Sequence, residues 1–398
     1  MNILIYTQYF FPETNAAANR VSDLADFLAK NNEVTVLTGF PNHPLGKIIG
    51  NYKIKWLTKE KRENINILRS FLIIPWKTNS KFWRYLNYFS FAFSSFINLF
   101  KIKNLDVVFV SSPPISILIL AYLYAKLKKI KLVVDLRDLW PEAAISLNFI
   151  KKDFITKQLE ILVKKSYFYA SKIIVNTPSF QKTLVEEYKI TNDKILYLPN
   201  GFDIDGNMLI KNSLKRSSFD FKIFYAGLFG FAQNVNLILD LALVCQNNKE
   251  NIQFVLVGDG PLKNELKIKI RNLNLQNVTM FDYQKKQDLF NLINECDLGL
   301  ITYQINDTFR KNIPSKIFEY MFLEKPIIIN LKGQASTIIE DGDFGICIET
   351  NDPQTLYNGI KENIYTLKQK GINGFLYLQK HFNKNDLFFK LQEEINKL

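Results

Sequence analysis

With 398 residues, 47% of them hydrophobic, the chain is longer than a single hydrophobic core usually supports, and two domains are expected. Its three cysteines lie far apart without CxxC spacing, which argues against a structural zinc site or a disulfide framework and fits a reducing cytoplasm. The formal net charge of +13 falls entirely in residues 1–199, which hold 28 Lys and Arg against 15 Asp and Glu, whereas residues 200–398 hold 23 of each kind. The two halves are therefore expected to meet different partners.

Strand-like runs alternate with helix-sized intervals along the first half, which is typical of parallel βα units. The predicted strands are Ile3–Tyr6, Val34–Thr38, Ile65–Arg69, Val107–Ser111, Leu132–Asp135, Ile173–Asn176 and Ile195–Leu198. Because the chain opens on a strand without a basic segment before it, no signal peptide is predicted. The longest apolar runs, 86–100 and 115–125, are too short or too interrupted to span a bilayer.

A second series of strands follows in the other half. Its members are Lys222–Ala226, Phe254–Val257, Val278–Phe281, Leu298–Ile301, Ile327–Asn330 and Ile346–Glu349. Between the two series, Pro199–Asp203 and the polar residues 206–220 predict a linker. Two doubly wound α/β sheets would leave a cleft between the carboxyl ends of their strands, where such folds bind ligands.

The first strand is followed by the turn Phe11–Arg20, which contains no glycine. A dinucleotide pyrophosphate could not approach this backbone closely, so the turn is not expected to bind one. It could instead shape an acceptor pocket to which Arg20 contributes a charge, although an ordinary surface arginine at a helix start is an equal alternative. His43 follows the second strand and could also face the cleft.

Charged side chains also follow the strand at 132–135, in the sequence Arg137-Asp-Leu-Trp-Pro-Glu142. Arg137 can bind a phosphate in a bidentate manner, and Asp138 can orient a hydroxyl or stabilise developing positive charge. A structural ion pair between Arg137 and a neighbouring acid is the alternative.

In the second half, two strand-to-helix loops contain glycines that could bring backbone N–H groups close to a phosphate. The candidate residues are Gly227, Gly230 and Asn234 in the first loop and Gly258 and Gly260 in the second. Each loop is a weak signal singly, and the two together predict part of a nucleotide pocket.

A third loop of this kind precedes a helix that begins near Pro314-Ser-Lys. Pro314 favours a helix start, and the free N–H groups of a first turn beside Ser315 would form an anion site to which Lys316 adds a charge. Lys316 and Glu319 are three residues apart, so they share one helix face about 4.5 Å apart along the axis. The pair could hold a nucleotide by its diphosphate and its ribose hydroxyls. A capped surface helix with a Lys/Glu pair is the alternative.

Two Asp-x-Asp sequences, Asp203–Asp205 and Asp341–Asp343, could be taken for a metal-bound diphosphate site. Neither lies beside the glycine loops, and with Lys316 and a helix terminus available a divalent ion is not required. The chain has only two histidines, and no Ser/His/Asp set can be assembled. Neither a metal nor nucleophilic hydrolysis is therefore expected.

The positive charge is concentrated in residues 47–103, where 12 basic residues accompany only two acids. Interleaved with them are Trp56, Trp76 and Trp83. Basic residues mixed with Trp and Tyr suit the interface of an anionic bilayer, on which residues 81–100 could lie as an amphipathic helix. A helix packed into the core beneath solvated lysines is the alternative, and a nucleic-acid surface is not expected.

These motifs together resemble glycosyltransferase family 4, and most closely the bacterial amino-sugar transferases, of fucosamine type, that build O-antigen and capsule. The resemblance spans essentially the whole chain. It is carried by Thr38–Pro44, Ser111–Pro114, Arg137–Glu142, Pro199–Gly201, Tyr225–Gly227, Val257–Pro261 and Pro314–Tyr320. It implies the GT-B fold, in which two Rossmann-like domains face a cleft, and metal-independent transfer with retention of configuration.

The resemblance also implies the domain limits. Residues 1–199 would bind the acceptor, residues 200–375 would bind the nucleotide sugar, and the C-terminal segment 376–398, with its helix at Lys384–Leu398, would return toward the first domain. Glu319 matches the acid that binds the donor ribose, and Pro314–Lys316 matches a segment beside the diphosphate.

The chain departs from the family pattern at four positions. Lys311 stands where many relatives carry an acid that contacts the donor sugar, and Arg137 stands where many carry histidine. Phe231 and Asn234 replace an arginine and a lysine of the phosphate-binding glycine loop. More of the diphosphate charge would therefore fall on Lys316.

The resulting hypothesis is a glycosyltransferase that moves a sugar, expected to be an N-acetylated amino sugar, from a UDP donor to a lipid-linked cell-envelope glycan precursor. It would work in the cytoplasm at the inner face of the cell membrane. Lys316, Arg137 and Asp138 are the candidate catalytic residues. A hydrolysing nucleotide-sugar epimerase on the same fold stays open, as does a catalytically silent sugar-binding subunit, which the missing acid at Lys311 makes conceivable.

Overall fold

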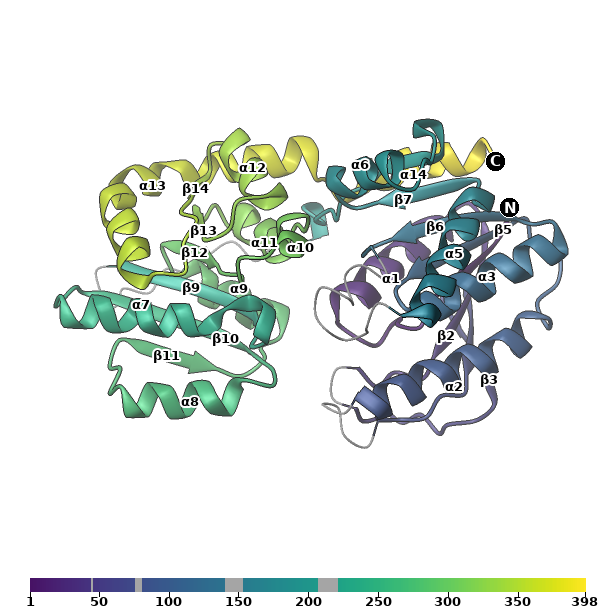
Figure 1. Cartoon of the computed structure of the whole chain (residues 1–398), viewed down its shortest axis with the longest axis horizontal. Helices are drawn as coiled ribbons and strands as arrows, with labels where there is room; N and C mark the ends of the chain where they lie inside the picture. The colour runs from purple at the N-terminus through teal and green to yellow at the C-terminus, as the bar shows by residue number, and fades with distance from the viewer. Residues whose placement is uncertain (44–45, 76–80, 140–152, 207–220) are drawn as a thin grey trace. The chain divides into compact units, whose positions relative to one another are not determined.

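The computed structural model describes residues 1–43, 46–75, 81–139, 153–206 and 221–398. Within this part of the chain the residues form two compact units, one of Met1–Pro199 with Phe388–Leu398 and one of Asn200–Leu387. Each unit contains a mostly or wholly parallel sheet flanked by helices (Figure 1). The two units are described one at a time.

Among the described residues, the first unit holds an eight-stranded sheet with the order β3-β4-β2-β1-β5-β6-β7-β8. Its strands are β1 Asn2–Tyr6, β2 Glu33–Gly39, β3 Leu57–Arg62, β4 Ile65–Ser70, β5 Val107–Ser112, β6 Lys131–Leu136, β7 Lys172–Val175 and β8 Ile195–Tyr197. All neighbours pair in parallel except β3 and β4. The seven strands that the sequence predicts are all confirmed.

The eighth strand, β3, was not predicted, because its sequence Leu-Thr-Lys-Glu-Lys-Arg contains no apolar run. It joins β4 through a tight hairpin turn in which Glu63 has a φ of 50°, a conformation that such turns require. Its charged side chains suit an edge strand, since charge on an edge discourages pairing with other chains.

In the described ranges, five helices of the first unit follow its strands, and one more comes from the end of the chain. They are α1 Ala16–Leu28, α2 Lys81–Leu99, α3 Ile115–Lys128, α5 Phe154–Tyr169, α6 Pro178–Glu186 and the last residues of α14 Lys384–Asn396. Phe388 of α14 contacts the Phe27 ring of α1 with 5.4 Å between ring centres. The C-terminal helix begins at Lys384, as predicted, and the preceding helix continues past residue 375 to His381.

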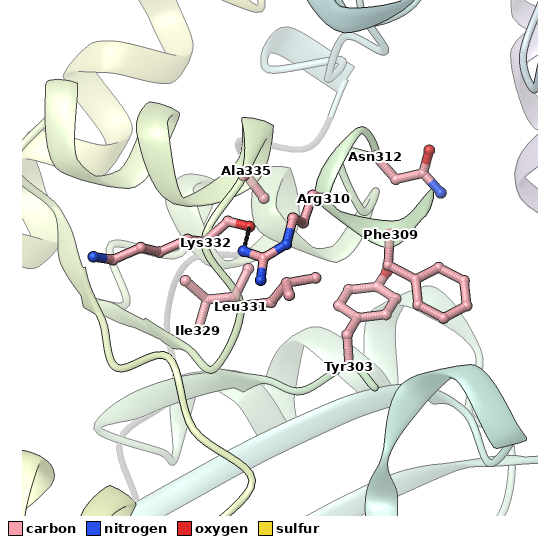
Figure 2. A pocket seen from close by; sticks show the side chains of 9 residues that line it. Tyr303, Phe309, Arg310, Asn312, Ile329, Leu331, Lys332 and Ala335 are labelled. Atoms are coloured by element: carbon pink, nitrogen blue, oxygen red, sulfur yellow. Dashed lines mark hydrogen bonds between the residues drawn. The ribbon is translucent and has the colours of Figure 1, made fainter. Parts of the chain in front are cut away.

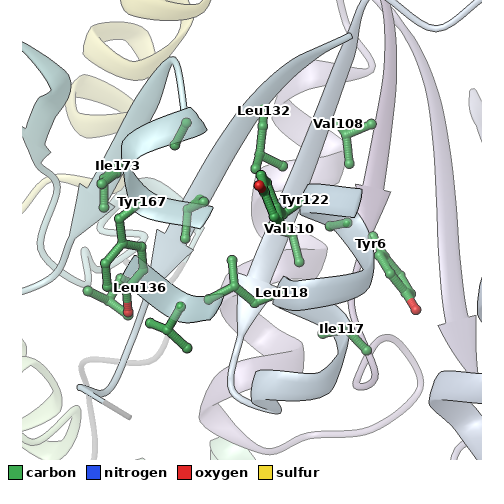
Figure 3. Close-up of a cluster of buried hydrophobic side chains, with 14 of the residues drawn as sticks. Tyr6, Val108, Val110, Ile117, Leu118, Tyr122, Leu132, Leu136, Tyr167 and Ile173 are labelled. Atoms are coloured by element: carbon green, nitrogen blue, oxygen red, sulfur yellow. The ribbon is translucent and has the colours of Figure 1, made fainter. Parts of the chain in front are cut away.

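The core of the first unit lies between the sheet and the helices α3 and α5, as Figure 3 shows. Val110 lies near Leu118 and Tyr122 of α3, and Leu136 and Ile173 lie near Tyr167 of α5. Parallel strands are buried on both faces, which explains why their sequences are almost continuously apolar. The sheet is thereby held rigid, and its exit loops are placed at one edge.

Among the described residues, the second unit holds a six-stranded parallel sheet with the order β11-β10-β9-β12-β13-β14. Its strands are β9 Phe221–Leu228, β10 Ile252–Asp259, β11 Val278–Phe281, β12 Leu298–Ile301, β13 Ile327–Ile329 and β14 Gly345–Cys347. Its helices are α7 Val235–Asn247, α8 Lys263–Asn272, α9 Lys286–Asn294, α10 Asp307–Arg310, α11 Lys316–Phe322, α12 Gln334–Asp341 and α13 Pro353–His381. The six predicted strands are confirmed, although β14 begins one residue earlier than expected.

Some predicted features lie outside the described residues. These are Trp76 and Lys77 of the basic segment, Trp140–Glu142 after β6, and all but the first residue of the predicted linker at 206–220. Within the ranges that the structure describes, no helix is both long enough and apolar enough to cross a bilayer.

Candidate functional site

The loops that follow β9 and β10 pack directly on each other. Gly258 lies opposite Gly227 in the sheet register, and a side chain at Gly258 would collide with the Gly227 carbonyl oxygen, only 1.9 Å from a Cβ. A Cβ at Gly260, which has a φ of 154°, would lie 2.5 Å from the Phe229 carbonyl oxygen. These two glycines therefore permit contact between loops. The sequence suggested that a phosphate comes close to these two glycines. At both positions the neighbouring atoms belong instead to the protein backbone.

Gly227 serves a different purpose, because its missing side chain leaves room for Lys316. A Cβ at Gly227 would lie 2.9 Å from the Lys316 Nζ. The ammonium also lies 3.9 Å from the centre of the Tyr225 ring, a cation–π contact. Two elements distant in sequence, the end of β9 and the start of α11, thus enclose one lysine head group.

The Lys316 ammonium is buried and has no hydrogen-bond partner among the described residues. Burial lowers the pKa of Lys316 to about 7, and the nearby charge of Glu319 only partly opposes this shift. A buried cation without a partner is costly to a protein unless a ligand supplies one. The arrangement is therefore suited to binding an anion.

Glu319 lies one turn further along α11, as the spacing predicted. Burial raises the pKa of Glu319, while the positive charges of Lys286 and Lys316 oppose that rise. Lys286, the first residue of α9, was missed by the sequence analysis. The sequence feature that could have identified Lys286 was its position directly after the loop that follows the predicted strand Val278–Phe281. An ionised Glu319 can accept hydrogen bonds from a pair of ligand hydroxyls.

The first turn of α11 offers fewer free N–H groups than the sequence suggested. The N–H of Ile317 donates to the Pro314 carbonyl and that of Phe318 to the Ser315 carbonyl, both at 3.2 Å. Ser315 precedes the helix, and its side chain makes no capping bond. The Lys316 side chain, rather than the helix terminus, is therefore the feature of this loop that is suited to an anion.

The β9 loop continues through Gly230 to Asn234, which has a φ of 45°. The Asn234 amide donates to Asn351 at 3.0 Å and accepts from Gln304 at 3.2 Å, so it joins three loops at the same edge of the sheet. Phe231 is highly exposed beside it.

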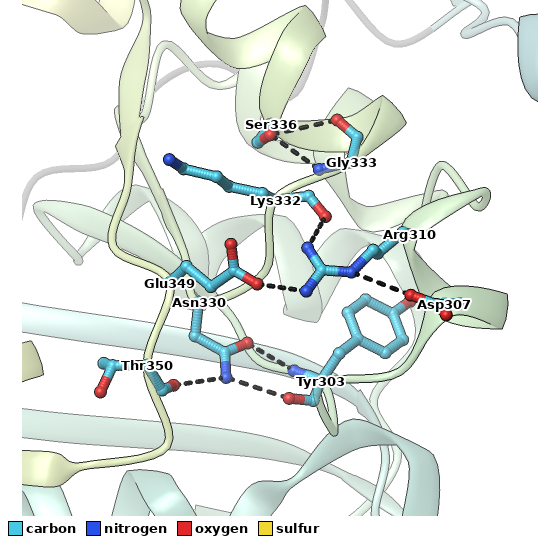
Figure 4. A network of polar contacts seen from close by, with 9 residues as sticks. All are labelled: Tyr303, Asp307, Arg310, Asn330, Lys332, Gly333, Ser336, Glu349 and Thr350. Carbon is cyan, nitrogen blue, oxygen red and sulfur yellow. Dashed lines mark hydrogen bonds and ion pairs between the residues drawn. The ribbon is translucent and has the colours of Figure 1, made fainter.

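Beyond α10, a shallow surface depression is lined by Tyr303, Phe309, Arg310, Asn312, Ile329, Leu331, Lys332, Gly333 and Ala335 (Figure 2). The Arg310 guanidinium pairs with Glu349 and donates to the Lys332 carbonyl at 3.1 Å. Asn330 bonds the backbone of Tyr303 and Thr350 (Figure 4). This network connects the loops that follow β12, β13 and β14. It thereby fixes the neighbours of Lys311, which directly follows Arg310.

In the first unit, Arg20 is buried, which contradicts the alternative of an ordinary surface arginine. Its side chain is 8% exposed and pairs with the 2% exposed carboxylate of Asp135 at 3.0 Å. It also donates to the carbonyls of Leu198 and Pro199. Because these bonds tie α1 to β6 and to the end of the unit, the guanidinium acts in the structure of the unit.

Arg137 and Asp138 follow β6. The Arg137 guanidinium donates to the Pro113 carbonyl at 2.7 Å, and its Nε is buried without a hydrogen-bond partner among the described residues. No acid in that part of the chain lies within ion-pair distance of Arg137, so the alternative of a direct salt bridge is wrong there. Burial lowers the pKa of Arg137 and raises that of Asp138. Both side chains therefore keep capacity for a ligand.

His43 belongs to a cluster whose other members the sequence analysis missed. The Glu13 carboxylate accepts the backbone N–H groups of Asn42 and His43, both at 2.8 Å, and burial raises the pKa of Glu13 to about 7. The Tyr9 ring lies edge-on to His43 at 5.2 Å. The position of Glu13 in the loop after the first strand was the available signal.

The Asp-x-Asp sequences are engaged locally. Asp203 accepts the Gly206 N–H at 3.0 Å, and Asp343 pairs with Lys370 at 2.6 Å. Searched over its described ranges, the chain shows no group of three or more His, Cys, Asp or Glu placed to hold a metal ion.

Two protein-family models match the chain, one in each half. Residues 17–205 match the model described as Glycosyltransferase Family 4. Residues 209–365 match the model described as Glycosyl transferases group 1. The two matches lie one after the other, as the two domains of a single enzyme would.

Two relatives of this chain are uncharacterized glycosyltransferases of Methanocaldococcus jannaschii. One is 23% identical over 96% of this chain and 95% of the relative. The other is 25% identical over 45% of this chain and 44% of the relative.

Several solved structures share the fold over almost the full length. Anabaena HepE in complex with UDP has a TM-score of 0.70 at 16% identity and covers 100% of both chains. Sucrose-phosphate synthase from Thermosynechococcus elongatus has a TM-score of 0.71 at 14% identity and covers 100% of this chain and 98% of that one. WaaG, a glycosyltransferase involved in lipopolysaccharide biosynthesis, has a TM-score of 0.67 at 13% identity, with 98% of each chain covered. The predicted GT-B fold is thereby confirmed.

Proposed function

We propose that this chain, a glycosyltransferase of the GT-B fold, transfers a sugar from a UDP donor to a lipid-linked cell-envelope glycan precursor, with retention and without a metal. The donor is proposed to carry an N-acetylated amino sugar. The observation that carries the proposal is the Lys316 ammonium, which is buried beside Gly227 without a partner. HepE, a structure of similar fold, was solved with UDP.

Lys316 would act on the leaving diphosphate. Negative charge grows on the diphosphate as the bond to the sugar breaks, and a fixed cation in a water-poor site stabilises that charge more strongly than water does. A diphosphate beside Lys316 would restore the ordinary pKa of the ammonium, because an opposite charge favours the protonated form. Charge neutralisation by Lys316, with Lys286 nearby, makes a divalent ion unnecessary.

Glu319 would hold the ribose of the donor. Its carboxylate can accept hydrogen bonds from two neighbouring hydroxyls, and it lies one helical turn from the cation. Burial raises the pKa of this carboxyl, and the positive charges of Lys286 and Lys316 oppose that rise. One face of α11 would therefore hold both the diphosphate and the sugar of the nucleotide.

The first unit would serve the acceptor. The Arg137 Nε, which has no hydrogen-bond partner among the described residues, would donate to a phosphate. The Asp138 carboxyl would orient a sugar hydroxyl or stabilise positive charge that develops in the transition state. His43 is held by the Glu13 cluster. Residues 47–103 are proposed to attach the enzyme reversibly to the anionic inner face of the cell membrane, where a lipid-linked acceptor would be found.

The test is calorimetric titration of UDP into the full chain, combined with an assay of UDP release from UDP-sugars with and without an acceptor. Glu319→Ala should weaken UDP binding about 10- to 150-fold, since a hydrogen bond to a charged group typically contributes about 1.5–3 kcal/mol. Glu362→Ala, at an exposed position of α13, is the control and should bind normally. UDP release without any acceptor would favour the epimerase, and binding without turnover would favour a silent subunit.

A further inference from the structure

The Lys316 ammonium contacts an aromatic ring where a buried charge usually has an ionic partner. Its Nζ lies 3.9 Å from the centre of the Tyr225 ring and has no hydrogen-bond partner among the described residues. Buried charges in proteins are normally paired or hydrogen-bonded. The ring of Tyr225 therefore stands in the place that an acid or a carbonyl group would ordinarily take.

The Tyr225 ring is fixed independently of the lysine. It is 1% exposed and stacks on the Phe229 ring, with 6.2 Å between ring centres and 20° between ring planes. Its hydroxyl donates to the Leu228 carbonyl at 3.0 Å. Neither interaction involves Lys316, so the ring keeps its position whether the amine is charged or neutral.

Gly227 keeps the space beside the ring open. A Cβ at this residue would lie 2.9 Å from the Lys316 Nζ and 3.5 Å from the Tyr225 hydroxyl oxygen. The φ of Gly227 is 148°, a conformation that residues with a side chain rarely adopt. The short sequence Tyr225-Ala-Gly227 thus provides both the ring and the room in which the ammonium lies against it.

Lys263 shows the other way of holding a lysine in this unit. Its ammonium, at the start of α8, lies 3.3 Å from Asp259 and 3.1 Å from Asp282. A diphosphate could bind Lys263 only in competition with these two carboxylates. The Tyr225 ring attracts a cation through its quadrupole and carries no negative charge. The N–H donors of Lys316 that point away from the ring therefore stay available to a ligand.

We propose that Tyr225 is a positioning residue for the donor diphosphate: its ring holds the Lys316 ammonium in place in the empty site, favours its charged form and leaves its outward N–H groups to the ligand. The ring covers one side of the ammonium, so the contact is retained when the diphosphate binds from another side. The inference rests on the proposed function, which brings a diphosphate to Lys316.

The ring is expected to influence the protonation of Lys316. Burial lowers the pKa of Lys316 to about 7, and an aromatic face that favours the ammonium opposes this effect. Without the ring the pKa would fall further, and a larger share of the empty sites would be neutral.

Other titratable groups also act on this contact. They are Glu319 on α11, which Lys286 on α9 influences in turn, and the phenols of Tyr303 and Tyr320 beside Tyr225. Burial raises the pKa of both phenols, so they stay neutral around pH 7. A change that follows the loss of the ring is therefore expected to appear in the titration of Lys316.

The experiment is calorimetric titration of UDP into the full chain at two pH values. Two variants without the ring, Y225L and Y225M, should bind UDP about 5- to 30-fold more weakly than the native chain at about pH 8, and no more than about fourfold more weakly at about pH 6. The loss is larger at the higher pH because the empty site must there take up a proton to meet the diphosphate.

Two controls separate the ring face from other effects. Y225F keeps the ring and loses the bond to Leu228, so it should keep the UDP affinity and the pH profile of the native chain. Y357L removes a ring that lies 5.6 Å from the Lys361 ammonium in the same unit, and it should also bind UDP as the native chain does. Circular dichroism shows that each variant is folded.

A double-variant cycle shows whether the ring acts through the ammonium. Lys316→Ala removes the cation, so adding Y225L to it should weaken UDP binding no further. Further weakening in that background would overturn the inference. So would native affinity in Y225L and Y225M, an equal loss at both pH values, or a Y225F that behaves like Y225L. A native chain that does not bind UDP would instead contradict the proposed donor site.

Discussion

Each unit places a basic side chain near the exit edge of its sheet, and the two side chains are held in opposite ways. Arg20 in the first unit is buried against Asp135 and donates to two backbone carbonyls. Lys316 in the second unit is buried without a hydrogen-bond partner in the described part of the chain. The first is satisfied by hydrogen bonds within the fold, whereas the second meets the Tyr225 ring and the charge of Glu319 and keeps its hydrogen-bonding capacity for a ligand. Burial alone therefore does not single out a candidate functional charge; burial without a hydrogen-bond partner does.

This difference predicts that loss of Arg20 affects stability and that loss of Lys316 affects activity. Arg20→Ala should lower the free energy of unfolding of the first unit by about 3–5 kcal/mol, because it breaks a buried ion pair and leaves the Asp135 carboxylate buried with a hydrogen bond from Ser111. All four tryptophans lie in residues 1–199, so their fluorescence during urea unfolding reports on this unit.

Arg62→Ala is the control for this measurement. Arg62 pairs with Asp26 at 2.8 Å, with both side chains about a third exposed, and such pairs contribute about 0–1 kcal/mol. Equal losses from the two arginine variants would show that Arg20 is not a structural charge and would remove the contrast with Lys316.

Lys316→Ala should lower turnover about 10²-fold or more, by analogy with removal of a transition-state charge donor. It should leave the stability of the fold unchanged or higher, because an unpaired buried ammonium is lost. Lys380→Ala, at an exposed position of α13, should change neither quantity. Unchanged UDP binding and unchanged transfer in Lys316→Ala would mean that the donor site is elsewhere.

The pH dependence of UDP binding tests the state of the same lysine. Burial lowers the pKa of Lys316 to about 7, so above pH 7 the ligand-free site is mostly neutral and must take up a proton to meet a diphosphate. UDP affinity should fall by up to about tenfold per pH unit above pH 7, until the pKa of the bound state is reached. Calorimetry in buffers of different ionisation enthalpy should detect the proton uptake.

The unliganded protein should respond with the opposite sign. The pKa of Lys316 is lower in the folded state than in the unfolded chain, so between the two values the unfolded chain binds more protons. The contribution of this group to the free energy of unfolding therefore rises with pH above about 7. Lys316→Ala should remove both effects, and a pH profile of UDP binding that this variant shares with the native chain would assign the titration to another group.

The sheets could be predicted from sequence because a parallel strand is buried on both faces and is apolar throughout. The run Ile327–Ile329 is an example. β3 was not predicted, because an edge strand is not buried on both faces and needs no continuous apolar run. The shared face of Lys316 and Glu319 followed from helical spacing alone.

The surroundings of that pair could not be predicted. Tyr225 and Lys286 reach it from β9 and α9, which only the order of strands in the sheet brings near α11. Gly258 and Gly260 suggested a phosphate loop because a glycine lets another group come close to its backbone. The sequence does not show whether that group is a ligand or another part of the protein. Their neighbours are backbone atoms of the adjacent loop.

The smallest effect is expected from a chelator. A diphosphate can be neutralised by a fixed lysine or by a divalent ion, and Lys316 with Lys286 nearby provides the first means. The carboxylates that could provide the second, Asp203 and Asp343, already bind Gly206 and Lys370. Transfer activity should therefore survive excess EDTA in the native chain. Complete loss with EDTA and rescue by magnesium or manganese would show that Lys316 does not suffice to neutralise the diphosphate. The second unit would then need a bound metal cation in addition to the anion that its buried lysine would bind.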